Sequence, residues 1–225
     1  MFTISLVSQK GGTGKSTVLV GLAVEAARRT YDVAVIDIDP QASAAKWKDR
    51  REAENPAVVS AQASRLKQTL DAARSGEVDF AFIDTAGRLD DAALAAMRAS
   101  DLVLIPTRAS MVEIETLPQV KDMVRLAGNP PTFVLLNGIH PTAGAKAVAD
   151  IHKAIRDMFE FECCPVHVSQ LNAYSDAITS GVGPQEAEPQ GRAADELQRM
   201  FEFISQTVKG ASAHVVEDRR HSAAT

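Results

Sequence analysis

The sequence predicts an α/β protein with a doubly wound, mostly parallel sheet that is flanked by helices. The first observation is that near-continuous apolar runs of strand length alternate with longer amphipathic segments, as strands buried on both faces require. The second is the length of 225 residues, which suits one α/β domain with a sizeable core. The apolar runs are Phe2–Val7, Val33–Asp37, Val58–Ala61, Val78–Asp84, Leu102–Pro106, Thr132–Asn137 and the shorter Cys164–Val168.

The composition is that of a globular protein that folds in water. Hydrophobic residues make up 45% of the chain, and 24 basic against 29 acidic residues give a net charge of −5. These values exclude disordered and collagen-like classes for the body of the chain. No apolar stretch reaches the roughly 18 residues that span a bilayer, and no basic segment precedes the first apolar run as in a secretory signal. The adjacent Cys163 and Cys164 suit neither a structural disulfide nor a metal quartet. We therefore expect a cytoplasmic protein.

The chain is expected to form one domain over residues 1–209. A helix over Ser16–Thr30 follows the first strand, and a last helix over Ala193–Val208 follows the polar loop Gly181–Gly191. Residues 210–225 carry few large apolar side chains, which predicts a disordered tail. The charges of this tail cancel, so we expect no basic amphipathic helix and no membrane binding.

A glycine-rich loop between the first strand and the first helix is the strongest functional signal. Glycines let backbone N–H groups point into a concave loop, and the following helix adds its positive N-terminal end. In such a phosphate loop Lys15 reaches the β- and γ-phosphates, and the Ser16 hydroxyl binds Mg²⁺. The sequence therefore predicts a P-loop NTPase with Mg²⁺. The predicted nucleotide-binding residues are Lys10, Gly11, Gly12, Thr13, Gly14, Lys15, Ser16 and Thr17.

The loop departs from the general GxxxxGK[ST] pattern at its start. Gln9 stands where the first glycine belongs, and a second lysine, Lys10, stands beside it. This is the deviant Walker A form, and the sequence here resembles the ParA/MinD ATPase family. In that family the extra lysine reaches across an ATP-bound dimer to the partner's phosphates, which would make Lys10 and Lys15 both catalytic. The spacing by itself shows only a second cation near the phosphates.

Two aspartates follow the second strand in the segment Asp37-Ile38-Asp39-Pro40-Gln41. Ligands of parallel α/β sheets bind at the carboxyl ends of strands, where this pair falls. One carboxylate can support the metal shell and the other can position water. The family's switch I has this DxDPQ pattern, which makes Asp39 the hydrolysis residue and leaves Asp37 for the metal. The alternative is a pair of aspartates that cap the next helix.

Asp84 ends another buried strand, as the metal-binding Walker B aspartate does. The residues after it, Thr85-Ala86-Gly87-Arg88, depart from the family pattern and resemble the signal-recognition GTPases. Those GTPases read guanine with an [NT]KxD element, but here Asn137 is followed by Gly138, with no Lys or Asp in the required places. ATP is therefore favoured as the nucleotide. Asn137 either contacts adenine or forms the turn before Gly138.

The resemblance covers about residues 2–208 and is closest to the short ParA, ParF-like plasmid partition ATPases, which also carry a Trp at the place of Trp47. It implies a Mg²⁺-dependent ATPase of weak intrinsic activity that forms a homodimer with ATP. It also implies non-specific DNA binding on the nucleoid in the ATP state and a ParB-like partner.

Other functions found in the superfamily are the alternatives. A relative that positions chemoreceptor clusters, carboxysomes or conjugative DNA has the same core, so a cargo adaptor can replace the ParB-like partner. A MinD-like membrane-cycling ATPase is less favoured because it needs a basic amphipathic C-terminal helix. A nitrogenase-reductase-like iron–sulfur protein needs two separated ligand cysteines, which this chain lacks.

Three basic residues are the candidates for DNA contact. Lys153 and Arg156 lie three residues apart and can share a helix face, and Arg192 matches a loop position near the family's DNA-binding region. The alternative is that these side chains belong to ordinary solvated helix faces.

Overall fold

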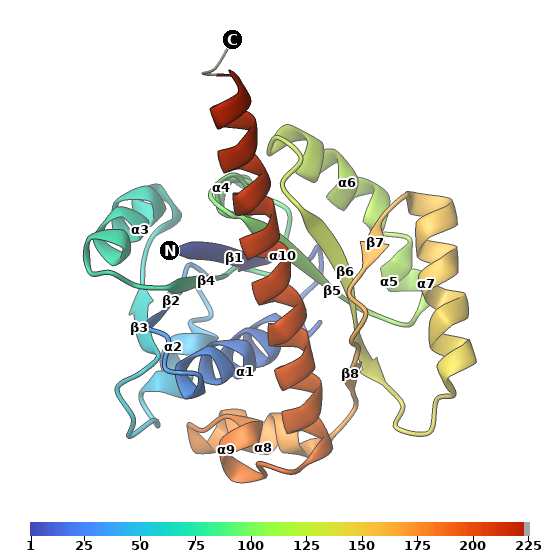
Figure 1. The fold of residues 1–225 in the computed structure, drawn as a ribbon. Helices are drawn as coiled ribbons and strands as arrows, with labels where there is room; N and C mark the ends of the chain where they lie inside the picture. The colour runs from blue at the N-terminus through green and yellow to red at the C-terminus, as the bar shows by residue number, and fades with distance from the viewer. Residues whose placement is uncertain (223–225) are drawn as a thin grey trace.

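The computed structural model describes residues 1–222 and the side chains of residues 1–211. It contains one parallel sheet in the order β3-β2-β4-β1-β5-β6-β7, with β8 also paired to β6 (Figure 1). The strands are β1 (Phe2–Leu6), β2 (Val33–Asp37), β3 (Ala57–Ser60), β4 (Phe80–Asp84), β5 (Leu102–Arg108), β6 (Thr132–Ile139), β7 (Glu162–Cys163) and β8 (Val168–Ser169). The predicted fold class is confirmed.

Helices cover both faces of this sheet. They are α1 (Lys15–Arg28), α2 (Ser43–Lys48), α3 (Leu66–Ser75), α4 (Asp91–Arg98), α5 (Met111–Ile114), α6 (Leu117–Leu126), α7 (Ala145–Phe159), α8 (Asn172–Ser180), α9 (Pro184–Ala187) and α10 (Arg192–Ser222), with a 3₁₀ turn η1 (Ala63–Arg65). On one face α1 and α10 pack together against the sheet, while α3, α4, α6 and α7 lie over the other (Figure 1). The sheet therefore separates two apolar layers, as a doubly wound fold requires.

The packing of α1 against α10 fixes the face that lies behind the phosphate loop. A Cβ on Gly21 would lie 2.8 Å from the methyl carbons of Leu197, so a larger residue there would force the Leu197 side chain to move. Farther along, the rings of Phe80 and Phe201 meet edge to face with centroids 5.2 Å apart. These contacts anchor α1, and with it the loop that precedes it, to the centre of the sheet.

The position of β1 decides where a ligand can bind. β1 lies between β4 and β5, so the chain winds outward from it in both directions. At this switch point the loops after neighbouring strands diverge and leave a crevice at the carboxyl ends. The register places Leu6 beside Asp84, and Asp84 beside Asp37. The motif residues that follow these strands are thus gathered at one edge of the sheet.

Three expectations about the C-terminal third are wrong. Cys164–Val168 is not a strand: two short strands flank it, and Pro165, which lacks the N–H needed for a sheet ladder, lies between them. The polar loop Gly181–Gly191 contains α9, which begins at Pro184, a residue preorganised for the first helical turn. The last helix continues beyond Val208 to Ser222.

The segment 210–222 is therefore helical where the sequence predicted a disordered tail. It contains no proline, and its alanine, glutamate and arginine residues are compatible with a helix that has already been nucleated upstream. Residues 223–225 of the predicted tail lie outside the described residues.

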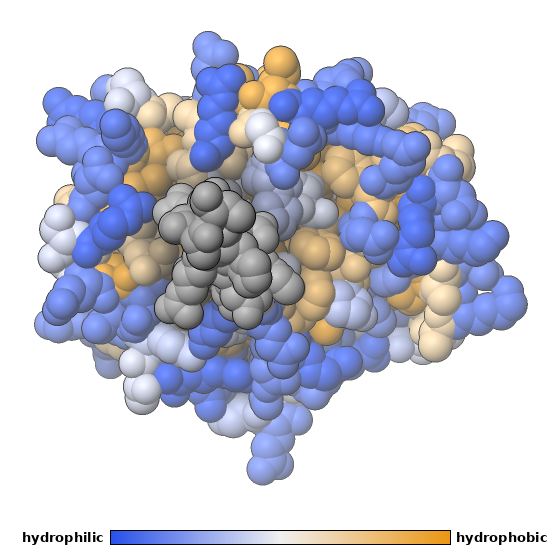
Figure 2. Space-filling view, turned by 45° about the horizontal axis from the view of Figure 1, so that its top comes forward, coloured by the Kyte–Doolittle hydropathy of each residue, from blue (hydrophilic) through white to orange (hydrophobic). Residues whose placement is uncertain are grey.

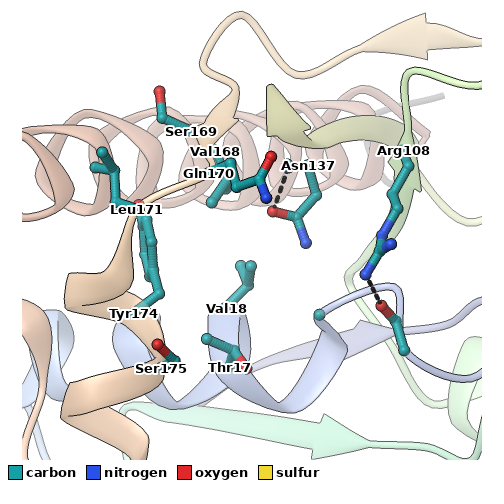
Figure 3. A pocket seen from close by; sticks show the side chains of 13 residues that line it. Thr17, Val18, Arg108, Asn137, Val168, Ser169, Gln170, Leu171, Tyr174 and Ser175 are labelled. Atoms are coloured by element: carbon teal, nitrogen blue, oxygen red, sulfur yellow. Dashed lines mark hydrogen bonds between the residues drawn. The ribbon is translucent and has the colours of Figure 1, made fainter. Parts of the chain in front are cut away.

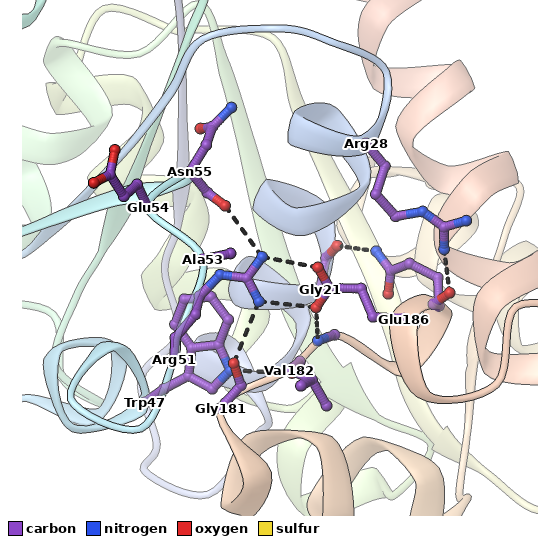
Figure 4. Close-up of polar contacts among 12 residues, drawn as sticks. Gly21, Arg28, Trp47, Arg51, Ala53, Glu54, Asn55, Gly181, Val182 and Glu186 are labelled. Atoms are coloured by element: carbon purple, nitrogen blue, oxygen red, sulfur yellow. Dashed lines mark hydrogen bonds and ion pairs between the residues drawn. The ribbon is translucent and has the colours of Figure 1, made fainter.

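A buried arginine just after α2 connects that helix to the segment between α8 and α9 (Figure 4). Arg51 pairs with both carboxylate oxygens of Glu186, each at 2.8 Å, and its guanidinium lies 4.9 Å from the centre of the Trp47 ring. The indole N–H of Trp47 in turn donates to the Val182 carbonyl at 3.0 Å. The side chain of Arg51 is only 4% exposed. Trp47 thus belongs to the core, and this Arg51 cluster ties two distant segments together.

Replacing the buried arginine, in Arg51→Ala, is expected to lower the free energy of unfolding by about 2–3 kcal/mol, because it leaves the partly buried Glu186 without its cation. The matched control is Arg74→Ala, which removes an ion pair to Asp71 whose two side chains are 58% and 57% exposed. That change is expected to cost less than about 0.5 kcal/mol. Urea unfolding of both variants measures the difference, and equal losses would contradict the assignment.

Candidate functional site

The phosphate loop has the backbone shape that an anion requires. Gly12 and Gly14 adopt positive φ values of 76° and 86°, which side-chain-bearing residues rarely adopt. Gly14 is also the residue before α1, and no described side chain caps that helix end. The first N–H groups of α1 are therefore left to a ligand, and the helix dipole favours a negative one.

Lys15 is buried inside this loop, and a hydrogen bond fixes its ammonium group. It is 6% exposed, and its Nζ donates to Ser8 Oγ at 2.9 Å. Ser8 Oγ also donates to the Lys10 carbonyl at 2.8 Å, so one hydroxyl joins the lysine to the loop backbone. Burial lowers the pKa of Lys15, against the opposing charges of Asp84 and Asp39. A phosphate would add negative charge beside this ammonium and offset the cost of its burial. Ser8 belongs to no motif, and sequence reasoning missed it.

Asp84 is the feature that points to a metal ion. Its side chain is fully buried, and neither carboxylate oxygen makes a hydrogen bond of regular geometry among the described residues, although the Ser16 hydroxyl lies nearby. Burial raises the pKa of Asp84 to about 7, with Ser16 and Lys15 opposing the shift and Asp37 adding to it. Unpartnered buried carboxylates are costly unless a cation compensates them. Carboxylate and hydroxyl oxygens are ligands that Mg²⁺ prefers, so Asp84 and Ser16 fit a Mg²⁺ ion shared with phosphate oxygens.

Asp37 caps the start of α2, which is the alternative role that the sequence left open for it. Its Oδ1 accepts from the Asp39 N–H, and its Oδ2 accepts from the N–H groups of Ala44 and Ala45, all at 3.1 Å. Burial raises the pKa of Asp37, and these backbone hydrogen bonds oppose the rise only in part. Because three N–H groups already occupy the carboxylate, Asp37 holds the start of α2, and its expected place in the metal shell stays a prediction.

Asp39 lies in a cavity of about 530 Å³ together with Lys15, Ser16 and the loop after β4. One of its carboxylate oxygens accepts from the Gln41 N–H at 2.9 Å, which orients the side chain. Gly87 closes the cavity: a Cβ on it would lie 2.4 Å from the nitrogen of Gly11. The loop after Asp84 can therefore rest on the phosphate loop only because residue 87 is glycine.

A second cavity of about 330 Å³ adjoins the first, and both are lined by Gly12, Gly14 and Thr17 (Figure 3). Its size and partly apolar lining suit a base and a ribose. The lining includes Val18, Arg108, Asn137, Val168, Ser169, Gln170, Leu171, Tyr174 and Ser175.

Asn137 lines this cavity but also supports the phosphate loop. Its Nδ2 donates to the Thr13 carbonyl at 2.6 Å, and its Oδ1 accepts from the Gly138 N–H at 2.8 Å. Asn137 and Gly138 both lie within β6, at the irregularity of its pairing with β8, so the turn expected before Gly138 is wrong, and a contact with adenine stays a prediction. Arg108, which sequence reasoning missed, donates to the Gly12 carbonyl at 2.8 Å from the opposite side of the loop.

Lys10 does not line either cavity within the described part of the chain. Its Nζ instead donates to the Val112 carbonyl at 3.0 Å, at the surface. Val112 and Met111, on α5, are 65% and 58% exposed. The second lysine of the motif thus lies outside its own site, beside an exposed apolar pair.

The three predicted DNA contacts are each paired with an acid. Lys153 lies 3.3 Å from Asp157, and Arg156 lies 3.3 Å from Glu162. Arg192 lies 3.0 Å from the buried Glu196 and also donates to the Pro141 carbonyl. These residues do not form a basic face, and a DNA interface stays a prediction.

Comparison with known families identifies the architecture. The model of the CobQ/CobB/MinD/ParA nucleotide binding domain matches residues 4–218. The chain belongs to this family. It is therefore a P-loop nucleotide-binding protein of the ParA/MinD type. Within residues 1–222, no helix combines the length and hydrophobicity needed to cross a membrane. The face of the molecule drawn in Figure 2 is mostly hydrophilic, with hydrophobic residues scattered over it.

Individual relatives bear on one expectation. The maintenance of carboxysome distribution protein A of Gloeobacter kilaueensis is 31% identical over 147 residues, covering 64% of this chain and 67% of that protein. Its counterpart from Halothiobacillus neapolitanus is 26% identical over 216 residues, covering 90% and 96%. The ParA protein of Rhizobium radiobacter is 32% identical over 117 residues, covering only 50% and 51%. Among these relatives the carboxysome proteins match more of the chain than the ParA protein does, so they support the alternative of a positioning ATPase better than the expected closeness to short plasmid partition ATPases.

Solved structures show the same fold. The cell division ATPase MinD of Pyrococcus furiosus matches with a TM-score of 0.70 at 20% identity, covering 91% of this chain and 98% of that one. The MinD of Pyrococcus horikoshii, complexed with Mg-ADP, gives 0.69 at 18%, covering 90% and 95%. The Cyanothece McdA without ligand gives 0.68 at 17%, covering 92% and 99%.

Asp84→Asn is expected to flatten the pH dependence of stability. The pKa of Asp84 is about 7 in the folded protein and about 3.9 in an unfolded chain. The folded state therefore binds more protons between these values, and its stability falls as pH rises through them, by at most about 4 kcal/mol. Urea unfolding at pH 5 and pH 8, with a chelator present, should show a smaller loss for Asp84→Asn than for the wild type. Equal losses would contradict the raised pKa.

Proposed function

We propose that this chain is a Mg²⁺-dependent ATPase of weak intrinsic activity that dimerises around ATP and positions an intracellular cargo. The observation that carries the proposal is that the two lysines of the loop lie in different places. Lys15 is buried against Ser8 inside its own site, whereas Lys10 lies at the surface beside Met111 and Val112. A lysine placed outside its own cavity can serve the phosphates of a second subunit.

The chemistry is phosphoryl transfer to water, giving ADP and inorganic phosphate. The loop backbone and Lys15 bind the β- and γ-phosphates and stabilise the charge that develops on them. Ser16 and Asp84 hold Mg²⁺, which when bound neutralises phosphate charge. Asp39, in the same cavity, keeps one carboxylate oxygen available to accept a hydrogen bond from the attacking water. Each 1.4 kcal/mol of barrier that such alignment removes is worth about tenfold in rate.

The relatives favour one kind of cargo. The two carboxysome distribution proteins cover 64% and 90% of this chain, against 50% for the plasmid ParA protein. We therefore favour the positioning of a protein-bounded cargo through an adaptor that stimulates hydrolysis. Binding to nucleoid DNA without sequence preference in the ATP state would supply the surface along which the dimer distributes.

Partition of a plasmid through a ParB-like partner is the second candidate. It is favoured by the match of 32% over 117 residues to a protein named ParA. Both candidates use the same dimer and the same ATP cycle. They differ only in the partner, and a cytoplasmic protein that does not bind membranes serves either.

Asp39→Ala is expected to bind ATP and to form the dimer, but to hydrolyse ATP at least about a hundredfold more slowly, since water loses its orienting acceptor. Single-turnover hydrolysis and light scattering of the same sample measure the two properties. An undiminished rate would exclude Asp39 from the reaction.

The matched control is the double change Lys10→Ala with Asp39→Ala. It keeps Lys15 and both cavities, so ATP should still bind, but the protein should remain monomeric. A stable ATP-dependent dimer of this double variant would contradict the role of Lys10 in the partner's site.

A further inference from the structure

A buried carboxylate on α10 lies behind the wall of the second cavity, the one of about 330 Å³, which we call the base cavity. Glu196 is 2% exposed, and four donors converge on it. Its Oε2 accepts from the Ser169 N–H and from the Tyr174 hydroxyl, both at 2.9 Å. Its Oε1 accepts from Ser169 Oγ at 2.6 Å and from Arg192 Nε at 3.0 Å. Burial and the adjacent charge of Glu196 raise the pKa of Tyr174, which keeps this hydroxyl a donor.

Three of these four donors belong to two residues of the cavity wall. Ser169 and Tyr174 lie in the segment that runs from β8 into α8 and lines the base cavity (Figure 3). The Ser169 hydroxyl points away from the cavity in that view. On its other side the segment is held by the short β6–β8 pairing, which joins Asn137 to Val168 and is irregular at Ile139, and by the packing of α8 against α1 and α2. Glu196 is thus a principal support of this wall.

Only a carboxylate satisfies all four donors at once. The Ser169 backbone N–H and the Arg192 guanidinium can donate but cannot accept, and they lie on different oxygens of Glu196. A glutamine has one oxygen and one NH₂ group, so either orientation turns the NH₂ toward one of these obligate donors. The two hydroxyls can reverse their role, but the N–H and the guanidinium cannot.

We propose that Glu196 is a positioning residue that sets base selectivity: from α10 it holds Ser169, Tyr174 and the wall they belong to in the shape that accepts adenine. This inference rests on the proposed function, because it takes the second cavity as the base site of ATP. Glu196 does not line that cavity and acts through the two residues that do.

The test compares three probes that occupy different parts of the site. Dissociation constants of Mg-ATP, Mg-GTP and inorganic tripolyphosphate are measured by calorimetry for the wild type and for Glu196→Gln. Because either the Ser169 N–H or the Arg192 guanidinium then faces the amide NH₂, the wall should shift and the ATP-to-GTP affinity ratio should fall about tenfold. Binding of tripolyphosphate, which needs only the phosphate loop, should be unchanged. A general loss of structure would weaken all three probes together.

Removing the arginine should rescue the glutamine. In Glu196→Gln with Arg192→Ala, the amide NH₂ can face Ser169 Oγ, which accepts, while the amide oxygen takes the Ser169 N–H and Tyr174. The ATP-to-GTP ratio should then return to within about threefold of the wild-type value. A merely structural role predicts the opposite, since loss of a second polar contact would add to the damage.

Two further variants separate the effect of the Glu196 contacts from a general loss of structure. Glu202→Gln removes another acid of α10, one that pairs with Arg29 on α1, and it should leave the ratio unchanged. Tyr174→Phe keeps the ring and removes only the hydroxyl, so it should lower the ratio about threefold even if the Glu196 variants fail to fold.

The failures of the two proposals are distinguishable. A wild type that does not bind Mg-ATP would overturn the proposed function and the inference together. A wild type that binds ATP and GTP equally well, or variants of Glu196 and Tyr174 with an unchanged ratio, would overturn the inference and leave the proposed function standing.

Discussion

Lys15 and Asp84 are buried within electrostatic reach of each other beside the phosphate cavity, yet no ion pair among the described residues joins them. Burial disfavours the charged form of each group, lowering the pKa of one and raising that of the other. An anion beside the lysine and a cation beside the aspartate would relieve both costs at once. The fold creates this demand by placing the ends of β1 and β4 side by side at the switch point of the sheet.

α8, which borders both cavities, is anchored at both ends. It contributes Tyr174 to the base cavity and Ile178 to the phosphate cavity. Near its start Glu196 holds it to α10, and just beyond its end the Arg51 cluster holds it to α2, which begins after Asp39. The helix that borders both cavities is therefore connected to the segment that carries Asp39.

Local patterns predicted much of the site. The phosphate loop, Asp39 and Asp84 stand in short motifs at the ends of apolar strands, and the fold brings them together as expected. The motifs did not show that Asp37 caps α2, because its carboxylate could equally have faced a metal. Ser8, Arg108, Tyr174 and Glu196 were missed, since they act through pairings across the fold that carry no local signature: Arg108 and Gly12, for example, are 96 residues apart. β7 and β8 were misassigned because a proline split one apolar run.

The central claim is that the loop around Lys15 binds the phosphates of ATP and that Mg²⁺ completes the site. Calorimetric titration of Mg-ATP into the wild type, Lys15→Ala and Lys10→Ala tests it most directly. We expect one ATP per chain for the wild type, a loss of at least about a hundredfold in affinity for Lys15→Ala, since a charge-assisted contact in a desolvated site is removed, and near wild-type affinity for monomeric Lys10→Ala. Unchanged binding by Lys15→Ala, or no binding by the wild type, would contradict the account.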